Sequence, residues 1–221
     1  MAPHHVHGLV LKENAPEIRD LGRVPYAEAL SLQRSLVDER ADGRRGDIVL
    51  VCEHEPVITV GRRGPGGGTF RPPRGIAVVE VERGGEATYH GPGQAVVYPI
   101  VLLPEGRRDL HAFLRGLEEA TIETLAGFGV AGERVAGKTG VWIAGGGKKV
   151  ASIGVAVRRW VTYHGVALNV AADLSGFAGF APCGLPPEIM ANVGPSLPRG
   201  IGRSEVAARL AAAVARRVAS G

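Results

Sequence analysis

The sequence is poor in cysteine and has no long apolar run. Only two of its 221 residues are cysteines, Cys52 and Cys183, and they lie far apart, so we expect no disulfide framework. No stretch of ~20 apolar residues is present, which predicts no membrane-spanning helix. No basic and apolar leader opens the chain. Together these absences favour a protein of the reducing cytoplasm.

Lysine is also scarce. Of 26 basic residues only four are lysines, at positions 12, 138, 148 and 149, and the net charge is +4. The arginines are scattered along the chain instead of clustering on one element, which argues against a nucleic-acid partner. Lysine can lose its proton when it is desolvated, whereas arginine cannot, so the lysines of the middle third are candidates for acid–base chemistry.

The length and composition suit one large domain. The chain has 221 residues, 45% of them hydrophobic, which is enough for a core, and no internal repeat is visible. We therefore expect a single domain over residues 1–221. His4, His5 and His7 are interpreted as part of a frayed end, with metal capture as a minor alternative.

The apolar pattern predicts helices and strands that are grouped and do not strictly alternate. Helical spacing covers 26–40, 110–127, with Asp109 as the expected cap, and 204–218. Strands are predicted at 47–52, 57–60, 76–81, 95–103, 141–144, 149–158 and 163–170, and residues 173–203 are predicted to be loop-like. This grouping favours an α+β fold with helices on one side of the sheet.

Two glycine-rich segments stand out. Residues 61–75 are so rich in glycine, proline and arginine that we expect a mobile loop that does not pack. Residues 83–94, RGGEATYHGPGQ, predict a tight turn between two buried strands, where the backbone can approach a ligand closely. Arg83, Thr88, Tyr89 and His90 supply polar groups there, so this turn is a candidate binding loop.

Residues 132–139 match the pattern G-x-x-x-x-G-K-[ST] of a phosphate-binding loop. A working loop of this kind follows a buried strand and opens a helix, whose amides face the phosphates. Here a predicted helix precedes the pattern and a predicted strand follows it. We interpret the match as chance and expect Lys138 to be dispensable.

The two cysteines have different surroundings. Cys52 lies within a predicted strand, where a thiol is usually a small buried hydrophobe. Cys183 lies in the loop FAPCGL, where proline and glycine fix the backbone and leave the sulfur accessible. A reactive cysteine needs partial exposure and a nearby positive charge, so only Cys183 has a suitable setting.

The positive charge can come from Lys149, which enters a strand after a glycine turn. Alternation along the strand does not decide whether Lys148 or Lys149 points inward, and two surface lysines remain the alternative. His90 and His164 lie in two similar tetrads, both TYHG. Either histidine can be an ordinary hydrogen-bonded residue, but the repetition in polar turns favours a site.

Four ordered motifs in this chain resemble the lipoyl(octanoyl) transferases, or LipB family. They are EHEPVITVGR at 53–62, RGGEATYHGPGQ with the following Tyr98-Pro99, KVASIG with HGVALN, and Pro182-Cys183-Gly184. The resemblance spans most of the chain and is more specific than any single glycine pattern. It implies an α+β single domain with a mixed sheet, similar to the catalytic domains of biotin- and lipoate-protein ligases.

The resemblance also implies the site. Cys183 and Lys149 correspond to the family's catalytic Cys/Lys dyad. The acyl pocket would comprise Arg83, Gly84, Gly85, Glu86, Ala87, Thr88, Tyr89, His90, Ser152, Ile153, Gly154, His164, Gly165, Val166 and Ala167. One departure is Trp160, which stands where the family usually has glycine and would reshape the turn before His164, and with it the outline of the pocket.

The implied reaction moves an octanoyl group from octanoyl-acyl carrier protein to Cys183 and then to a lysine of a lipoyl domain. The acceptors would be 2-oxoacid dehydrogenases and the glycine cleavage H protein. No cofactor, metal or ATP is implied, since the thioester is already activated. Amides near Gly184 or the glycine turn would stabilise the oxyanion.

Acyl carrier protein is acidic as a class, so Arg62, Arg63, Arg158 and Arg159 are candidates to contact it. Ordinary solvated arginines are the equal alternative. Two other functions stay open. One is an ATP-dependent lipoate-protein ligase, which would use the lysine without the cysteine, and the other is a non-catalytic acyl- or nucleotide-binding module.

Overall fold

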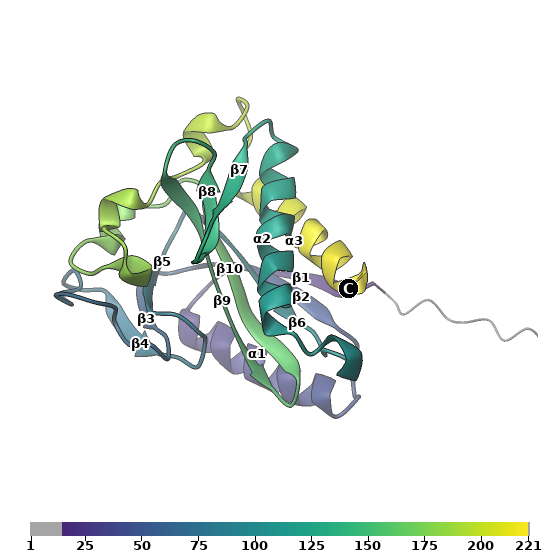
Figure 1. The fold of residues 1–221 in the computed structure, drawn as a ribbon. Helices are drawn as coiled ribbons and strands as arrows, with labels where there is room; N and C mark the ends of the chain where they lie inside the picture. Colours follow the sequence, from purple (N-terminus) through teal and green to yellow (C-terminus); the bar gives the residue numbers. More distant parts are fainter. Residues whose placement is uncertain (1–14, 221) are drawn as a thin grey trace, which may run out of the picture.

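Two β-sheets and three α-helices form the part of the chain that the computed structural model describes, residues 15–220 (Figure 1). His4, His5 and His7 lie outside the described residues. The helices are α1 (Tyr26–Ala41), α2 (Leu110–Ala126) and α3 (Arg203–Ser220). The strands are β1 (Glu17–Val24), β2 (Ile48–His54), β3 (Val57–Val60), β4 (Ala77–Glu80), β5 (Ala87–His90), β6 (Gln94–Ile100), β7 (Gly132–Val135), β8 (Lys138–Ile143), β9 (Lys148–Arg158) and β10 (Val161–Asn169).

The larger sheet has seven strands in the order β1-β2-β6-β10-β9-β8-β7. The pair β1 and β2 is parallel and the other neighbouring pairs are antiparallel, so the sheet is mixed, as predicted. A smaller sheet has the order β4-β3-β5. The central strands β2, β6 and β10 are buried along their whole length, which explains their nearly continuous apolar runs.

Helices cover both faces of the larger sheet, which corrects the expectation of helices on one side. Along β2, Ile48 and Leu50 face the cluster that contains Leu36 and Val37 of α1, whereas Val49 faces the cluster of α2 and α3. Successive side chains of a strand point to opposite faces, so an unbroken apolar strand needs a cover on each side. Figure 1 shows α1 on one side of the sheet and α2 with α3 on the other.

The three helices were predicted correctly, but three strands were not. The Asp109 carboxylate caps α2 and accepts a hydrogen bond of 3.0 Å from the backbone amide of Ala112. Strand β1 was missed because it alternates charged and partly exposed residues at the sheet edge. Strand β5 lies inside the segment 83–94 that we interpreted as a turn, and β7 forms the first half of the apparent phosphate-binding pattern.

The apparent phosphate-binding loop is a β-hairpin. Residues 132–135 form β7, and Lys138 begins β8, which pairs with β7 in antiparallel register. The prediction that a strand follows this pattern is confirmed, so no helix N-terminus lies there to hold a phosphate. Lys138 itself is exposed.

Two segments without long helices or strands meet beside the smaller sheet. Residues 61–75 contain no helix or strand, but they pack against the segment that carries Cys183, contrary to expectation. The amide of Arg71 donates to the carbonyl of Gly179 at 2.7 Å, and the rings of Phe70 and Phe180 lie 5.9 Å apart. Residues 174–196 form four short 3-10 turns.

None of the helices between residues 15 and 220 is long and apolar enough to span a membrane.

Candidate active site

A small cavity of about 40 Å³, partly open to solvent, lies where the two sheets meet. It collects side chains from α1, β5, β6, β9, β10 and two loops. The lining residues are Tyr26, Arg83, Gly84, Gly85, Thr88, His90, Tyr98, Ser152, Ile153, Gly154, His164, Gly165, Val166, Ala167 and Cys183.

Most of the residues that the resemblance assigned to a pocket thus share one cavity. Glu86, Ala87, Tyr89 and Lys149 are not among its lining residues in the described chain. The period of two along β5 explains part of this pattern, because Thr88 and His90 face the cavity while Ala87 and Tyr89 face the other way. Ala87 and Tyr89 instead belong to the core cluster beneath the smaller sheet.

Glycine lets the turn 83–85 lie directly on strand β9. The amide of Gly84 donates to the carbonyl of Val155 at 3.0 Å. A Cβ atom at Gly154 would lie 3.1 Å from the carbonyl oxygen of Gly84, which is tighter than ordinary contact. Gly154 also faces Gly165 across the β9–β10 pair, so two neighbouring strands lack side chains at this point. The cavity occupies the space beside them.

One side of the cavity is polar but uncharged near neutral pH. Burial lowers the pKa of His164 to about 3, and burial also lowers the pKa of His90 well below its ordinary value. Burial raises the pKa values of Tyr26 and Tyr98 above the ordinary value for tyrosine. These four side chains are therefore neutral at pH 7 and do not oppose an uncharged ligand.

Arg83 is the buried cation of the cavity. Only 7% of its surface is exposed, and its Nη2 donates to both the carbonyl oxygen and Oγ1 of Thr59, each at 2.8 Å. Burial lowers its pKa, but a guanidinium keeps its charge at neutral pH. Its Nε has no hydrogen-bond partner among the described residues. Arg83 thus combines a buried positive charge with a buried, unsatisfied donor, and it lines the cavity together with Cys183.

His164 has a left-handed backbone inside a strand. Its φ is 58°, which is unusual for a residue with a side chain. Its amide donates to Oε1 of the fully buried Gln33 at 2.8 Å, so α1 supplies the partner for this irregular position. Its ring nitrogen Nδ1 lies 3.4 Å from the hydroxyl of Tyr26, another α1 residue. The irregularity places the imidazole on the cavity wall.

Cys183 also has a left-handed backbone, with φ 55° and ψ 36°. Such a conformation is costly for a side-chain-bearing residue and is often found at functional sites. The side chain is partly exposed and lines the cavity. Cys52 differs in every respect, since it is fully buried in β2, and burial raises the pKa of its thiol. The interpretation of Cys52 as a buried hydrophobe is confirmed.

The amide of Gly184 is already occupied. It donates to the carbonyl of Ala181 at 3.0 Å, and the next amide, of Leu185, donates to the carbonyl of Pro182 at 3.1 Å. These bonds form the short turn that holds Cys183. In this conformation Gly184 does not have the free amide that our oxyanion hypothesis requires.

Lys149, and not Lys148, points into the protein. Lys149 is 1% exposed, and its ammonium donates to the carbonyl of Thr139 at 3.0 Å and lies 5.0 Å from the centre of the Trp142 ring. Lys148 is exposed, and its Nζ reaches the carbonyl of Glu188 at 2.8 Å. The question that alternation left open is thereby answered, because one lysine is buried and its neighbour is not.

Two neighbouring segments hold Lys149. A Cβ atom at Gly140 would lie 2.7 Å from Cε of Lys149, so glycine makes room for this side chain. The carbonyl of Lys149 accepts a hydrogen bond of 2.9 Å from the amide of Ala191, on the segment that follows Cys183. This bond ties the strand of Lys149 to the loop of Cys183. The hairpin β7–β8 and the cysteine segment thus both meet β9 at this lysine.

Sequence reasoning missed Tyr26, Gln33 and Tyr98 as site residues. Each lies on a helix or strand whose apolar spacing indicated only core. Tyr26 and Tyr98 line the cavity, and Gln33 supports His164 from behind. A buried glutamine on an otherwise apolar helix face was the one available signal, because a buried amide requires a polar partner.

Trp160 lies outside the cavity lining. Arg159 and Trp160 form the tight turn between β9 and β10, with φ values of 53° and 62°. Two consecutive positive φ angles are typical of type I′ hairpin turns, which favour glycine. Trp160 is 40% exposed, with the guanidinium of Arg108 4.6 Å from the centre of its ring. The bulky residue therefore changes the surface of this turn.

Among residues 15–220, no group of three histidine, cysteine, aspartate or glutamate side chains is arranged to hold a metal ion. The histidines near the cavity contact tyrosine, threonine and backbone groups instead.

Comparison with known proteins identifies the family. The family described as the lipoyl protein ligase A/B catalytic domain matches residues 25–215. An octanoyltransferase of Geobacter sulfurreducens is 48% identical over 90% of this chain and 81% of its own. An octanoyltransferase of Gloeobacter violaceus is 52% identical over 74% of this chain and 73% of its own. The chain belongs to the octanoyltransferase family. The resemblance drawn from the four motifs is confirmed, and octanoyltransferases are acyltransferases.

Solved structures show that this octanoyltransferase chain shares its fold with ligases. A lipoate protein ligase of T. acidophilum with bound lipoic acid has a TM-score of 0.69 at 18% identity, covering 92% of this chain and 86% of its own. A biotin protein ligase of Aquifex aeolicus with biotin and ATP has a TM-score of 0.54 at 13% identity, covering 91% and 70%. At such identities the likeness concerns the fold alone, and the predicted fold class is confirmed.

Proposed function

We propose that this chain carries an octanoyl group from acyl carrier protein, through a thioester on Cys183, to a lysine amine of a lipoyl domain. The observation that carries the proposal is the position of Cys183, a partly exposed thiol on the wall of a mostly uncharged cavity, in a chain 44–52% identical to octanoyltransferases. Residues 1–221 would act as one catalytic domain in the cytoplasm.

In the first half-reaction the thiolate of Cys183 attacks the carbonyl carbon of the incoming thioester. A new C–S bond forms to Cys183, and the C–S bond to the carrier's thiol breaks. The carrier leaves as a thiolate and takes up the proton that Cys183 released. The bond made is of the same kind as the bond broken, so no ATP is needed.

In the second half-reaction the acceptor lysine attacks the acyl-cysteine as a neutral amine. A C–N bond forms, the C–S bond to Cys183 breaks, and the amine loses a proton. We assign the proton transfers to Lys149: in the first half-reaction its ammonium gives a proton to the carrier's thiolate, and in the second the resulting neutral amine takes the proton that the acceptor amine loses. Its ammonium is held by one carbonyl, that of Thr139, and it would exchange this contact for the reacting groups.

The acyl chain would lie along Ile153, Val166 and Ala167, whose side chains are apolar. The neutral histidines and tyrosines that share the cavity do not repel it. For the tetrahedral oxyanion we favour the guanidinium of Arg83, since the amides of Gly184 and Gly84 are both occupied.

A lipoyl domain is a reasonable acceptor for this fold. The lipoate protein ligase of T. acidophilum, which has a TM-score of 0.66 to this chain, was solved in work on that ligase and its E2 lipoyl domain. We extend that acceptor class to this chain, and include 2-oxoacid dehydrogenases and the glycine cleavage H protein.

The test is intact-protein mass spectrometry after incubation with octanoyl-acyl carrier protein. We expect one octanoyl group on the wild-type protein, located on Cys183 by peptide mapping, and its loss when an apo lipoyl domain is added. ATP should change neither step. An acceptor octanoylated only with ATP would favour a lipoate-protein ligase, and binding of the acyl group without a covalent adduct would favour a non-catalytic module.

A further inference from the structure

The loop at 61–75 is the most one-sidedly charged exposed segment near the cavity. It contains Arg62, Arg63, Arg71 and Arg74 and no acidic residue. The stretch without carboxylates is longer than the loop, since none occurs between Glu55 and Glu80. The loop therefore has no acidic residue of its own to compensate its four positive charges.

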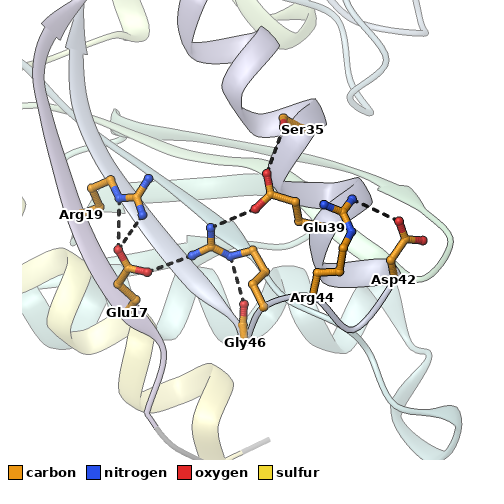
Figure 2. Close-up of polar contacts among 8 residues, drawn as sticks. Glu17, Arg19, Ser35, Glu39, Asp42, Arg44 and Gly46 are labelled. Carbon is orange, nitrogen blue, oxygen red and sulfur yellow. Dashed lines mark hydrogen bonds and ion pairs between the residues drawn. The ribbon is translucent and has the colours of Figure 1, made fainter.

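Elsewhere on the described surface most arginines contact a carboxylate. Figure 2 shows one such region, where Arg19 contacts Glu17 at 2.8 Å and Arg44 contacts Asp42 at 3.2 Å. Arg158 and Arg159, two of the arginines we first considered for a partner, are paired in the same way, with Asp38 at 2.5 Å and Asp42 at 2.7 Å. The positive charge of an arginine in such an ion pair is partly compensated, so it attracts an acidic partner less strongly.

The arginines of the loop are different. Arg62, Arg71 and Arg74 are exposed, and their side chains form no ion pair or hydrogen bond with the described residues. Arg63 has one long contact, 3.8 Å to Glu86, with 68% of its side chain exposed. The other arginines without a carboxylate contact are the buried Arg83 and, outside this loop, Arg107, Arg108 and Arg199.

The loop is fastened to both sides of the cavity mouth. At its start the amides of Arg62 and Arg63 donate to the carbonyls of Arg83 at 3.0 Å and Gly85 at 3.1 Å. At its end the amide of Arg71 donates to the carbonyl of Gly179, four residues before Cys183. The guanidinium groups are thus carried by a backbone that is bonded to the two loops of the site.

The cysteine segment contributes no competing charge. Residues 174–187 contain no acidic or basic side chain. Charge next to Cys183 therefore comes from the buried Arg83, from the loop at 61–75 and from Glu86, which is itself within ion-pair distance of Arg63. The mouth of the cavity is positive on the side of this loop.

We infer that Arg62, Arg71 and Arg74 form the docking surface for the acidic carrier protein that delivers the acyl thioester. This inference rests on the proposed function. The surface would receive carboxylates of the carrier while its acyl arm enters the cavity toward Cys183. It also separates these three arginines from Arg158 and Arg159, whose charges are already paired.

Such a surface acts chiefly on the rate at which the two proteins associate. Unpaired charges at the rim of an interface raise the association rate and make it dependent on salt, while they leave the chemical step unchanged. Removing them should therefore raise KM for a protein-bound donor and leave kcat alone. The kinetics with a small acyl-thioester donor, which lacks the acidic protein, should be unchanged when these arginines are removed.

The experiment compares two triple variants with the same change in net charge. The test variant is Arg62→Gln, Arg71→Gln and Arg74→Gln. The control is Arg19→Gln, Arg158→Gln and Arg159→Gln, which removes arginines that contact carboxylates. Acyl loading of Cys183 is measured with octanoyl-acyl carrier protein and with octanoyl-pantetheine, at about 0.02 M and about 0.5 M salt.

At low salt we expect kcat/KM of the test variant with octanoyl-acyl carrier protein to fall about tenfold, through KM, and the control to stay within about twofold of wild type. High salt should nearly abolish the difference. Loading from octanoyl-pantetheine should match wild type, which also shows that the test variant is folded.

Three outcomes would overturn the inference. Equal losses in the two triple variants would mean that only overall charge matters. An equal loss with octanoyl-pantetheine would place the defect inside the site. Normal loading with slower transfer to the acceptor would assign the surface to the lipoyl domain. If the wild-type protein is loaded by neither donor, the proposed function itself fails, which is distinct from a failed docking surface.

Discussion

The cavity has two walls of different construction. One wall comes from the paired strands β6, β9 and β10, whose side chains are placed by regular hydrogen bonding and a period of two. The other comes from the turn 83–85 and the segment around Cys183, which are held by individual hydrogen bonds and a left-handed backbone. The strand wall supplies mainly shape, and the loop wall supplies the nucleophile. Most of the shape and the nucleophile thus come from two kinds of backbone.

The strongest test of this division is Cys183→Ala. We expect loading and transfer to fall by at least about 10³-fold, because no other thiol reaches the cavity to form the acyl intermediate. Intact mass spectrometry and a transfer assay, at equal concentrations of folded protein, measure this.

The matched control is Cys52→Ala, on β2. It should keep both activities and cost only a modest amount of stability, since it removes one buried sulfur. Acyl loading found on Cys52, or normal transfer by the Cys183 variant, would contradict the assignment of chemistry to the loop wall.

Lys149→Met asks whether the strand side also takes part in the chemistry. Methionine keeps most of the volume but cannot transfer a proton, so we expect kcat for transfer to the acceptor to fall about 10²- to 10⁴-fold. Lys148→Met should leave kcat within about twofold, because Lys148 is exposed on the opposite face of β9. A large loss in the Lys148 variant with none in the Lys149 variant would move the role to the other lysine.

The pH dependence of stability tests the neutral side of the cavity. His164 binds a proton at its ordinary pKa of 6.5 when unfolded but only near pH 3 when folded, owing first to burial and then to Arg83. The stability due to this group is therefore complete above pH 6.5 and is lost as the pH falls toward 3. At about pH 5 the loss is about 2 kcal/mol.

His164→Asn should remove that part of the loss, since asparagine does not titrate and tolerates a positive φ. Urea unfolding at about pH 7.5 and about pH 5 gives the two free energies. Substituting the exposed His111 by Gln serves as control and should keep the wild-type difference. An unchanged pH dependence in the His164 variant would show that another group is responsible.

The smallest expected effect concerns the shape supplied by the strand wall. Ala167 lines the cavity, and Ala167→Leu would fill part of the proposed acyl site. We expect kcat/KM for octanoyl loading to fall about tenfold relative to hexanoyl loading, since about two methylene groups lose their place. Competition between the two donors measures the ratio. An equal fall for both chain lengths would mean that the acyl chain does not contact this residue.

The strand wall could be predicted well from the sequence, and the loop wall only through a resemblance. Apolar runs identify β6, β9 and β10 because buried strands need little else. Strand β5 was missed because Thr88 and His90, its cavity-facing residues, are polar and lie among glycines, as in a turn. No local pattern shows that residues 61–75 lie against Cys183, since that contact depends on Phe70 meeting Phe180 across 110 positions.

The residues of the site could likewise be predicted from the sequence only in part. Cys183 was favoured over Cys52 from its neighbours alone, and this distinction holds in the structure. Tyr26 and Gln33 could not be assigned because they belong to α1, whose position on the far face of the sheet was not foreseen. The tertiary packing of β8 against β9 decides whether Lys148 or Lys149 is buried, and local sequence does not reveal that packing.

The hairpin that resembles a phosphate-binding loop has a different use. The carbonyl of Thr139 holds the amine of Lys149, and the missing side chain of Gly140 leaves room for it. The amine and its support come from separate strands, so neither is complete without the other. A chimaera that received this hairpin from a distant homologue would have to receive β9 with it. In recombination between homologues, the hairpin and β9 therefore have to be exchanged together.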